Sequence, residues 1–458
     1  MKAASTILTE LDYYLKSEAL TLAQFAERSG LHSGTLSNII HGRRPIAMQQ
    51  LDRITSAIGR TEGFFYDLYI QEYVIEGAAD WRRIGPLLQR CAELDKLDEI
   101  KRVVQHVMDN LMYSPLLFES AESLFTQGYR DAAGILYDSV AEGEKLQHSE
   151  RLALCQYRLF AIRLGEDQDE NLRAANQFEP FVERLDEADQ LDALKHLADI
   201  YGSLDRLDKV EQLAELLENK AKIQFKYWRR DQAKKKSTRP YVFYILYAYL
   251  SRSAVADERG EYEKALYYTS LYSNLDWIKP PLSEEEKLVL DQFKEWATAN
   301  TYVYRLMSGQ VEILDEYVSY ISTRDEEIFT ALYKITQAAN HFNLNIDGIL
   351  EQFKSHLVYN IPQSQLGKFN HQLTDDRYTR FLIELATYYL GKKETEVGFN
   401  HLINGLEFSV RNRSSVNIVR CVGLFEKYRK SAPIYQLETY SSLISQIHET
   451  EEKVLSLL

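Results

Sequence analysis

Residues 21–59 read TLAQFAERSGLHSGTLSNIIHGRRPIAMQQLDRITSAIG, and this stretch decides how the N-terminal part of the chain folds. Its apolar residues recur three and four positions apart, which places them on one face of an α-helix. Gly30 breaks the pattern, and glycine readily adopts the left-handed conformation that ends helices. We therefore predict three short helices: one that Thr21 caps, one that begins near Ser33, and one that spans residues 48–58.

The helix that begins near Ser33 has two contrasting faces. Leu36, Ile39 and Ile40 share the apolar face, whereas the opposite face carries small or polar side chains. Pro45 prevents the helix from continuing, so the two arginines before it lie in an irregular exit segment. A short polar face followed by a basic exit favours a surface that meets a polyanion. The alternative is a small helical bundle without such a role.

This stretch resembles the Cro/repressor (Xre-like) helix-turn-helix family. The likeness rests on Ala26 at the helix contact, Gly30 in the turn, the Ser33-x-x-Leu36-Ser37 helix start and the Gly42-Arg43-Arg44-Pro45 exit. The resemblance implies that the Ser33–His41 helix enters the major groove of DNA, where Asn38 would pair with adenine. The reading face carries no Arg or Lys, so direct guanine readout is weak. The residues assigned to DNA are Ser33, Gly34, Thr35, Ser37, Asn38, His41, Arg43 and Arg44.

The distribution of charge agrees with DNA binding at this end alone. The chain of 458 residues has a net charge of -14. Residues 1–60 hold seven basic and five acidic groups, a net charge of +2, which leaves -16 for the rest. A polyanion would be repelled by most of this surface. A second basic stretch, residues 234–240, is expected to be a solvated loop between helices, with DNA contact as the alternative.

The remainder of the chain has the periodicity of stacked helices. Only 20 Gly and 9 Pro occur in the whole chain, which favours long helices with short connections. The segment Leu246–Tyr272 resembles a tetratricopeptide repeat, because small residues at Ala256, Gly260 and Ala265 let two helices approach and Tyr262 fills the gap. Degenerate copies or helix pairs of similar length lie at Leu191–Leu217, Ser114–Val140, from near Thr379, Phe293–Ile321 and Phe329–Leu357.

We therefore predict an all-α fold, with an N-terminal helix-turn-helix domain followed by a right-handed tetratricopeptide-like helical superhelix. Such a stack buries each helix pair on its neighbours and coils around a concave groove. The expected domains are residues 1–62 (Xre/Cro-like DNA-binding domain), 63–80 (linker helix) and 81–458 (degenerate repeats for peptide binding and dimerisation).

Two acidic stretches fit the capping box S/T-x-x-E, which marks the start of a helix. They are Ser283–Glu286 and Thr323–Glu326. Clustered acidic residues also suit the positive end of a helix dipole. The alternative, a carboxylate pair for acid–base catalysis, has no other support in the sequence.

The sequence gives no sign of an enzyme, a metal site or a cofactor. It contains no HExxH, GxSxG or GxGxxG motif, and its ten His and three Cys lack ligand spacing. The longest apolar run, residues 241–250, is too short to span a bilayer. We see no signal peptide in the first residues. These features predict a cytoplasmic protein that is not an enzyme, needs no cofactor and makes no membrane contact.

A helix-turn-helix followed by a degenerate tetratricopeptide array resembles the RRNPP family of quorum-sensing peptide receptors and the related phage arbitrium receptors. The resemblance implies a homodimeric transcription regulator that binds a double-stranded DNA operator. It also implies that a short imported signalling peptide in the concave groove changes the dimer geometry and operator binding. The alternatives are a regulator whose repeats bind a protein partner, and a Rap-like phosphatase with an accessory DNA domain.

Candidate peptide contacts follow from the chemistry of an extended backbone, whose N–H and C=O groups an Asn side chain can clamp. Asn300 and Asn340 lie 40 residues apart, about one repeat, so they are expected to line the same groove. Arg305 or Lys334 would hold a peptide carboxylate. Tyr302, Tyr304 and Tyr333 would form apolar walls. Each asparagine is alternatively an ordinary polar residue on a helix surface.

The dimer surface is expected on the C-terminal helices, residues 416–428 and 435–455. The second of these carries Tyr440, Leu443, Ile444 and Ile447 along one stripe. An ordinary helix that caps the repeat array would show the same pattern.

Overall fold

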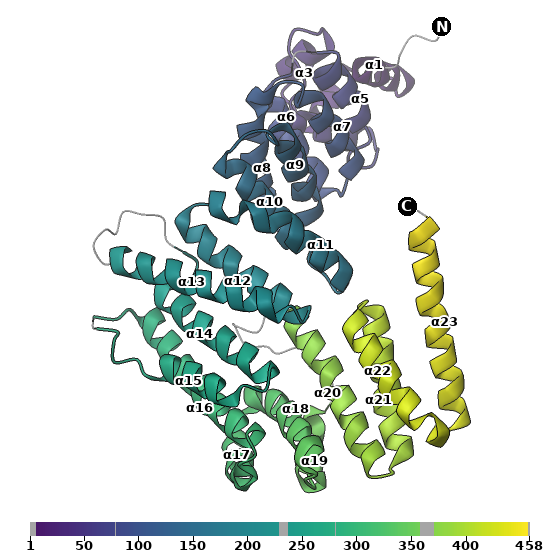
Figure 1. The fold of residues 1–458 in the computed structure, drawn as a ribbon. Coiled ribbons are helices and arrows are strands. Elements are labelled where there is room, and N and C mark those ends of the chain that lie inside the picture. Colours follow the sequence, from purple (N-terminus) through teal and green to yellow (C-terminus); the bar gives the residue numbers. More distant parts are fainter. Residues whose placement is uncertain (1–5, 78, 229–236, 280, 358–370, 457–458) are drawn as a thin grey trace. The chain divides into compact units, whose positions relative to one another are not determined.

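The computed structural model describes residues 6–77, 79–228, 237–279, 281–357 and 371–456. Within these ranges every regular element is helical, and 23 α-helices follow one another without a strand (Figure 1). The predicted all-α class is confirmed. No helix in these ranges has the length and apolar character needed to cross a membrane. Residues 234–236 of the predicted basic loop lie outside the described ranges.

The chain divides into two compact units, Met1–Ile162 and Arg163–Leu458. The helices of the first unit are α1 (Ile7–Ser17), α2 (Leu22–Ser29), α3 (Ser33–Ile40), α4 (Met48–Ala57), α5 (Tyr66–Ile70), α6 (Trp81–Glu93), α7 (Leu97–Val107), α8 (Ser114–Thr126), α9 (Arg130–Gly143) and α10 (Glu150–Arg163), which ends at the boundary.

The second unit contains α11 (Gln168–Phe178), α12 (Glu187–Ser203), α13 (Leu207–Trp228), α14 (Tyr241–Glu258), α15 (Tyr262–Ser273), α16 (Glu284–Met307), α17 (Leu314–Ile321), α18 (Asp325–Phe342), α19 (Asp347–Gln352), α20 (His371–Gly391), α21 (Thr395–Arg411), α22 (Ser415–Tyr428) and α23 (Ile434–Ser456). Short 3-10 turns precede or follow several of these helices.

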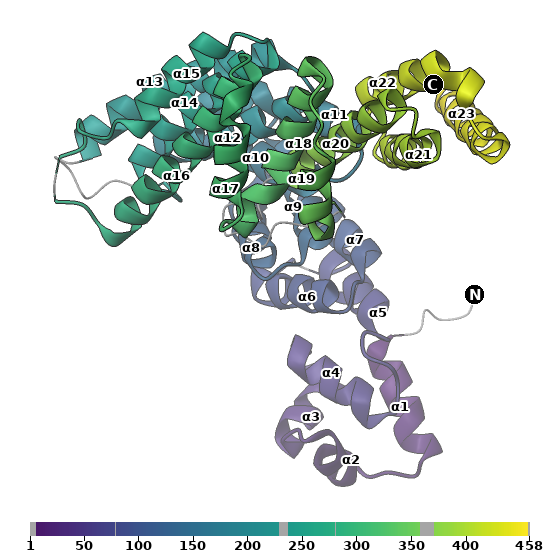
Figure 2. The same cartoon turned by 90° about the horizontal axis from the view of Figure 1, so that it is seen from below.

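The helices predicted at residues 21–59 form as expected, and α2 packs against both α3 and α4 (Figure 2). Thr21 caps α2 through a reciprocal capping box with Gln24, whose backbone N–H donates to the threonine hydroxyl at 3.3 Å. Gly30 ends α2 with a φ of +65°, a left-handed conformation that costs glycine little. Phe25 and Leu36 are fully buried between the helices.

The segment expected to be a linker helix, residues 63–80, holds α5 and a π-helical turn (Gln71–Ile75) and contributes to the core of the first unit. Tyr66 donates to Asp52 at 2.8 Å, and Arg90 of α6 contacts the same carboxylate at 3.0 Å. Glu72 accepts a hydrogen bond from the backbone N–H of Ile7 at 2.7 Å. These contacts tie α1 and α4 to the helices that follow, so the first unit extends well beyond residue 62.

The second unit consists of helix pairs that stack in chain order (Figure 1). The pair α14–α15 corresponds to the clearest predicted repeat. Ala256 and Ala265 are fully buried where its helices meet, and Gly260 makes the turn with a φ of +72°. The predicted pairs at residues 191–217 and from near Thr379 are α12–α13 and α20–α21, while residues 114–140 form α8–α9 in the first unit.

One of the two predicted capping boxes is confirmed and the other is wrong. Ser283 accepts from the backbone N–H of Glu286 at 3.1 Å and donates its own N–H to that side chain at 2.8 Å. Thr323 does not cap α18, because Arg324 occupies the N-cap position. The threonine hydroxyl instead donates to the carbonyl of Tyr320 at 3.5 Å. The preceding helix, α17, ends close to Thr323, so one of its carbonyl oxygens accepts the hydrogen bond of this hydroxyl.

Of the stripe on α23 that was expected to mark a dimer surface, Tyr440, Leu443 and Ile444 pack within their own chain. Tyr440 and Leu443 are buried against α21 and α22. The rings of Tyr440 and Phe425 stack with centroids 3.8 Å apart. The alternative of a helix that caps the array therefore describes these residues. The side chains of residues 450–455 lie outside the described part.

Candidate functional site

The first candidate site is the outward surface of α3 and the segment that follows it. Buried Leu36 and Ile39 fix which face of α3 points inward. All eight residues that the sequence assigned to DNA consequently lie on the outside, and none of them is buried. They are Ser33, Gly34, Thr35, Ser37, Asn38, His41, Arg43 and Arg44.

Both ends of α3 are held by local hydrogen bonds. At its start, Nδ1 of His32 accepts from the backbone N–H of Gly34 at 3.2 Å, so His32 serves as the N-cap. At its end, Nδ1 of His41 lies 2.7 Å from the carbonyl oxygen of Ser37. Arg53 of α4 donates to the carbonyl oxygen of Gly30 at 3.1 Å and so braces the turn between α2 and α3.

The polar groups at the exit of α3 are available for a ligand. The carbonyl of Asn38 accepts from the backbone N–H groups of Arg43 and Arg44, at 2.9 and 3.2 Å, which shapes the exit into a tight turn. Among the described residues, no side chain forms a hydrogen bond or ion pair with Asn38, Arg43 or Arg44. Two exposed guanidinium groups next to a free amide suit phosphate and base-edge contacts.

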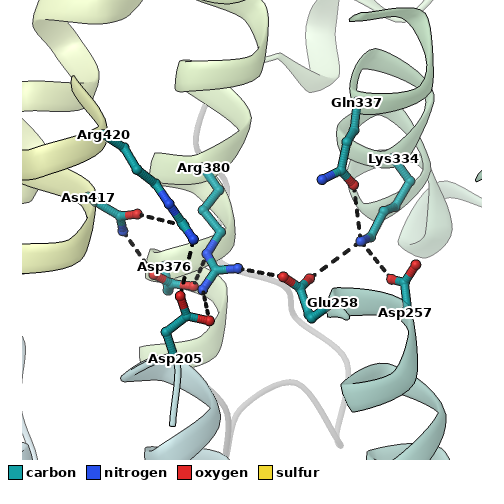
Figure 3. A network of polar contacts seen from close by, with 9 residues as sticks. All are labelled: Asp205, Asp257, Glu258, Lys334, Gln337, Asp376, Arg380, Asn417 and Arg420. Atoms are coloured by element: carbon teal, nitrogen blue, oxygen red, sulfur yellow. Dashed lines mark hydrogen bonds and ion pairs between the residues drawn. The ribbon is translucent and has the colours of Figure 1, made fainter. Parts of the chain in front are cut away.

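The second candidate site is a network of charged side chains in the second unit, which we call the charge network (Figure 3). Lys334, only 8% exposed, contributes its ammonium group on α18. This group lies 2.7 Å from Asp257 and 3.4 Å from Glu258, both at the end of α14, and 3.2 Å from the amide of Gln337. Burial alone would lower the pKa of Lys334, but Asp257 and its other neighbours raise it, so the ammonium stays charged.

Arg380 of α20 forms the other centre of the charge network (Figure 3). Its guanidinium group contacts Asp376 at 2.7 Å, Glu258 at 2.9 Å and Asp205 at 3.2 Å. Burial raises the pKa of Asp376, against the opposing effect of Arg380. Burial acts on Glu258 in the same sense, but Lys334 and Arg380 outweigh it and hold the pKa of Glu258 below its usual value. The contact with Glu258 joins the two centres.

The two asparagines predicted to clamp a peptide lie on neighbouring first helices of the stack and use their amide N–H groups internally. Asn300 on α16 donates to the hydroxyl of Tyr272 at 2.9 Å. Asn340 on α18 donates to the backbone carbonyl of Glu384 at 2.9 Å and to its carboxylate at 2.6 Å. Both asparagines are partly buried, and their side-chain carbonyl oxygens have no hydrogen-bond partner among the described residues.

The structure separates the remaining predicted peptide contacts into two groups. Tyr304 and Tyr333 are buried in the same core cluster, and Tyr333 lies beside the ammonium of Lys334. Tyr302 instead stacks on Tyr317 and donates to Glu316 at 2.8 Å. Arg305 is exposed and donates to Gln310 at 2.8 Å. Lys334, Tyr333 and Tyr304 are therefore near the charge network, whereas Tyr302 and Arg305 face the α16–α17 side.

The carboxylates and arginines that complete the charge network were not predicted from the sequence. Asp257 lies inside the clearest repeat, directly after Ala256, and Arg380 lies one residue after Thr379, near which the fourth copy starts. A signal was present: charged residues occupy positions close to the buried phase of these helices. Single-helix periodicity does not say which residues of distant helices meet.

The described residues were also compared with the requirements of a metal site. Among the described residues, no group of three or more His, Cys, Asp or Glu is arranged to hold a metal ion.

Comparison with known proteins gives no match. No family model matches the chain, and no curated protein or solved structure matches it.

Proposed function

We propose that this protein is a DNA-binding transcription regulator and that its second unit responds to a short signalling peptide. The observation that carries the DNA-binding part is the outward face of α3, where a polar helix surface is followed by two unpaired arginines. The pair α2–α3 would act as an Xre/Cro-like helix-turn-helix, with α3 in the major groove. Asn38 would read a base edge, and Arg43 and Arg44 would hold phosphates.

The charge of the chain supports a paired mode of binding. A net charge of +2 over residues 1–60 gives a single domain little attraction for DNA. Two such domains in a homodimer would read two half-sites of an operator and gain from both. We place this dimer in the cytoplasm, where an operator and an imported peptide would both be present.

The peptide-binding part rests on the resemblance to the RRNPP family, in which a tetratricopeptide-like superhelix of right-handed coil receives the peptide. The stacked helix pairs of the second unit are consistent with such an array. Asn300 and Asn340 each retain a carbonyl oxygen that could accept from a peptide N–H. Lys334 is paired with Asp257, so a peptide carboxylate would have to compete for it.

The DNA-binding proposal is tested by selecting binding sites from random duplex DNA and then measuring affinity over a range of salt concentrations. Replacing both Arg43 and Arg44 with alanine should weaken binding to every sequence and reduce the salt slope by about one per lost phosphate contact. N38A should relax specificity at one base position, by about 1–3 kcal/mol. K16A, which removes an exposed cation from α1, is the matched control and should change neither.

If R43A/R44A binds DNA as K16A does, the assigned surface is wrong.

The peptide part is tested with synthetic peptides cut from small secreted precursors encoded beside the gene. A peptide that changes the DNA affinity or dimer state supports the proposal. Affinity that changes only when a folded protein binds the repeats would favour the alternative of a protein partner.

A further inference from the structure

The charge network joins segments of the second unit that are far apart in the sequence (Figure 3). Arg380 lies on α20, whereas Asp205 lies in the α12–α13 turn and Glu258 ends α14. Arg420 of α22 contacts Asp205 as well, at 3.1 Å and across 215 residues of chain. Repeats in a stack contact mainly their neighbours. These ionic contacts therefore join helix pairs that are far apart in the stacking order, at a place where α12 and α20 also pack against each other.

The same junction has further polar contacts and a hollow beside it. The backbone N–H of Gln168 donates to the carbonyl of Asn412 at 3.0 Å, which links the start of α11 to the α21–α22 turn. Arg413 pairs with Asp167 at 3.0 Å. A hollow of about 90 Å³ is lined in part by Asp205 and Asp376. Water and small ions thus have room next to the ionic contacts.

Glu258 is the carboxylate that the two cationic centres share. One of its oxygens lies 3.4 Å from Lys334 and the other 2.9 Å from Arg380. Its side chain is 28% exposed, compared with 6% for Asp257 and 8% for Asp376. A charged group that arrives from solvent would meet Glu258 before the more deeply buried carboxylates.

Separating Arg380 from Glu258 leaves neither centre without a counter-ion. Lys334 keeps Asp257, and Arg380 keeps Asp376, which lies on its own helix. A buried ion pair normally resists opening because one charge is left uncompensated in a medium of low dielectric constant. Here that obstacle is reduced, because each buried cation would keep one carboxylate if the contact opened.

We propose that the contact between Arg380 and Glu258 is a charge clasp that sets the spacing between α12–α14 and α20–α22. A charged ligand group that displaces one partner would open the clasp and change this spacing. Binding of a ligand to the second unit would in this way change the shape of that unit. We call the effect of an opened clasp on DNA binding the regulatory step. This step rests on the proposed function, because it needs a ligand and a DNA-binding readout, whereas the clasp itself does not.

The clasp is tested by measuring one distance across the junction in the full-length protein. Spin labels are placed on cysteines introduced at Gln212 of α13 and Glu407 of α21, both exposed, and the distance is measured by double electron–electron resonance. In E258Q and R380Q we expect the distance distribution to broaden and lengthen. R259Q is the matched control: Arg259 also pairs with two carboxylates, but both lie on the neighbouring helix α13.

An unchanged distance in E258Q and R380Q, with wild-type helical content, would overturn the clasp. If R380Q fails to fold, E258Q decides alone, since Arg380 there retains two carboxylates. DNA affinity at fixed salt tests the regulatory step, and E258Q should change it about fivefold or more. A longer distance with unaltered DNA affinity would refute that step. A wild-type protein that binds no DNA would contradict the proposed function, while the distances still test the clasp.

Discussion

Replacing Lys334 with methionine removes an ammonium group and keeps most of the length and volume of the side chain. In the folded protein this leaves Asp257 without its cation, although only 6% of that side chain is exposed. One oxygen of Asp257 already has no hydrogen-bond partner among the described residues. Removing one member of a buried ion pair typically costs about 3–5 kcal/mol. We expect K334M to lower the free energy of unfolding by that amount at neutral pH.

The cost should depend on pH in a defined direction. Burial raises the pKa of Asp257 in the fold, and Lys334 opposes this increase. Without Lys334 the pKa rises further. A carboxyl with a raised folded pKa favours the fold below its unfolded pKa, and this contribution is lost as the pH rises through the folded pKa. The destabilisation by K334M should therefore be largest at neutral pH and smallest near pH 4, where a proton replaces the ammonium.

Urea unfolding followed by circular dichroism measures the change, and hydrogen exchange of α14 and α18 assigns it to this region. In the double variant K334M/D257N both partners are neutral, so most of the lost stability should return. K287M removes an exposed lysine that lies 2.6 Å from Glu284, and it should cost less than about 1 kcal/mol. If K334M costs no more than K287M, or if its cost is independent of pH, the ionised and buried pair is refuted. Lys334 would then be free for a ligand.

Three further predictions concern the helices themselves. Gly30→Ala places a side chain at a φ of +65° and should lower the stability of the first unit by about 1–2 kcal/mol. Gly423→Ala lies in the interior of α22 with open space around it and should raise stability by about 0.5–1 kcal/mol. Thermal unfolding of the two variants measures both changes. His32→Asp gives α3 a stronger N-cap, so it should raise the melting temperature, while its negative charge should weaken DNA binding. A higher melting temperature with unchanged DNA affinity would contradict the assigned surface. Tyr440→Ala removes a ring stacked on Phe425 and should cost about 3–5 kcal/mol, seen as faster amide exchange in α23; unchanged exchange would show that α23 docks without it.

The helices around α3 could be predicted almost to the residue because their signals are local. The cap at Thr21, the turn at Gly30 and the start at Ser33 depend on neighbours within four positions. The failed capping box at Thr323 shows the limit of such reasoning. Its four-residue pattern is correct, but α17 ends only two residues earlier and takes up the hydroxyl. Competition between two adjacent helices is invisible in a motif that describes only one.

The predicted peptide contacts depended on a longer inference, and the structure distributes them accordingly. Spacing by one repeat placed Asn300 and Asn340 on neighbouring first helices of the stack. It did not show that each asparagine would already hold a partner, because Tyr272 and Glu384 come from other helices. The same limit explains Tyr302. Residues close in sequence on α16 point to different sides, and only packing decides which side faces the charge network.

Ionic contacts between distant helix pairs serve a purpose in the second unit that apolar packing between neighbours does not. Stacked repeats are stabilised pair by pair, so small changes in the angle between neighbours accumulate along the array. Arg380 contacts carboxylates from the α12–α13 turn and from α14, and so limits that accumulation at one point. Apolar groups of similar volume would often be as stable or more so, but they would pack without a fixed partner. A guanidinium group that requires its carboxylates favours one arrangement, and under the clasp proposal a charged group able to replace Glu258 would alter that arrangement.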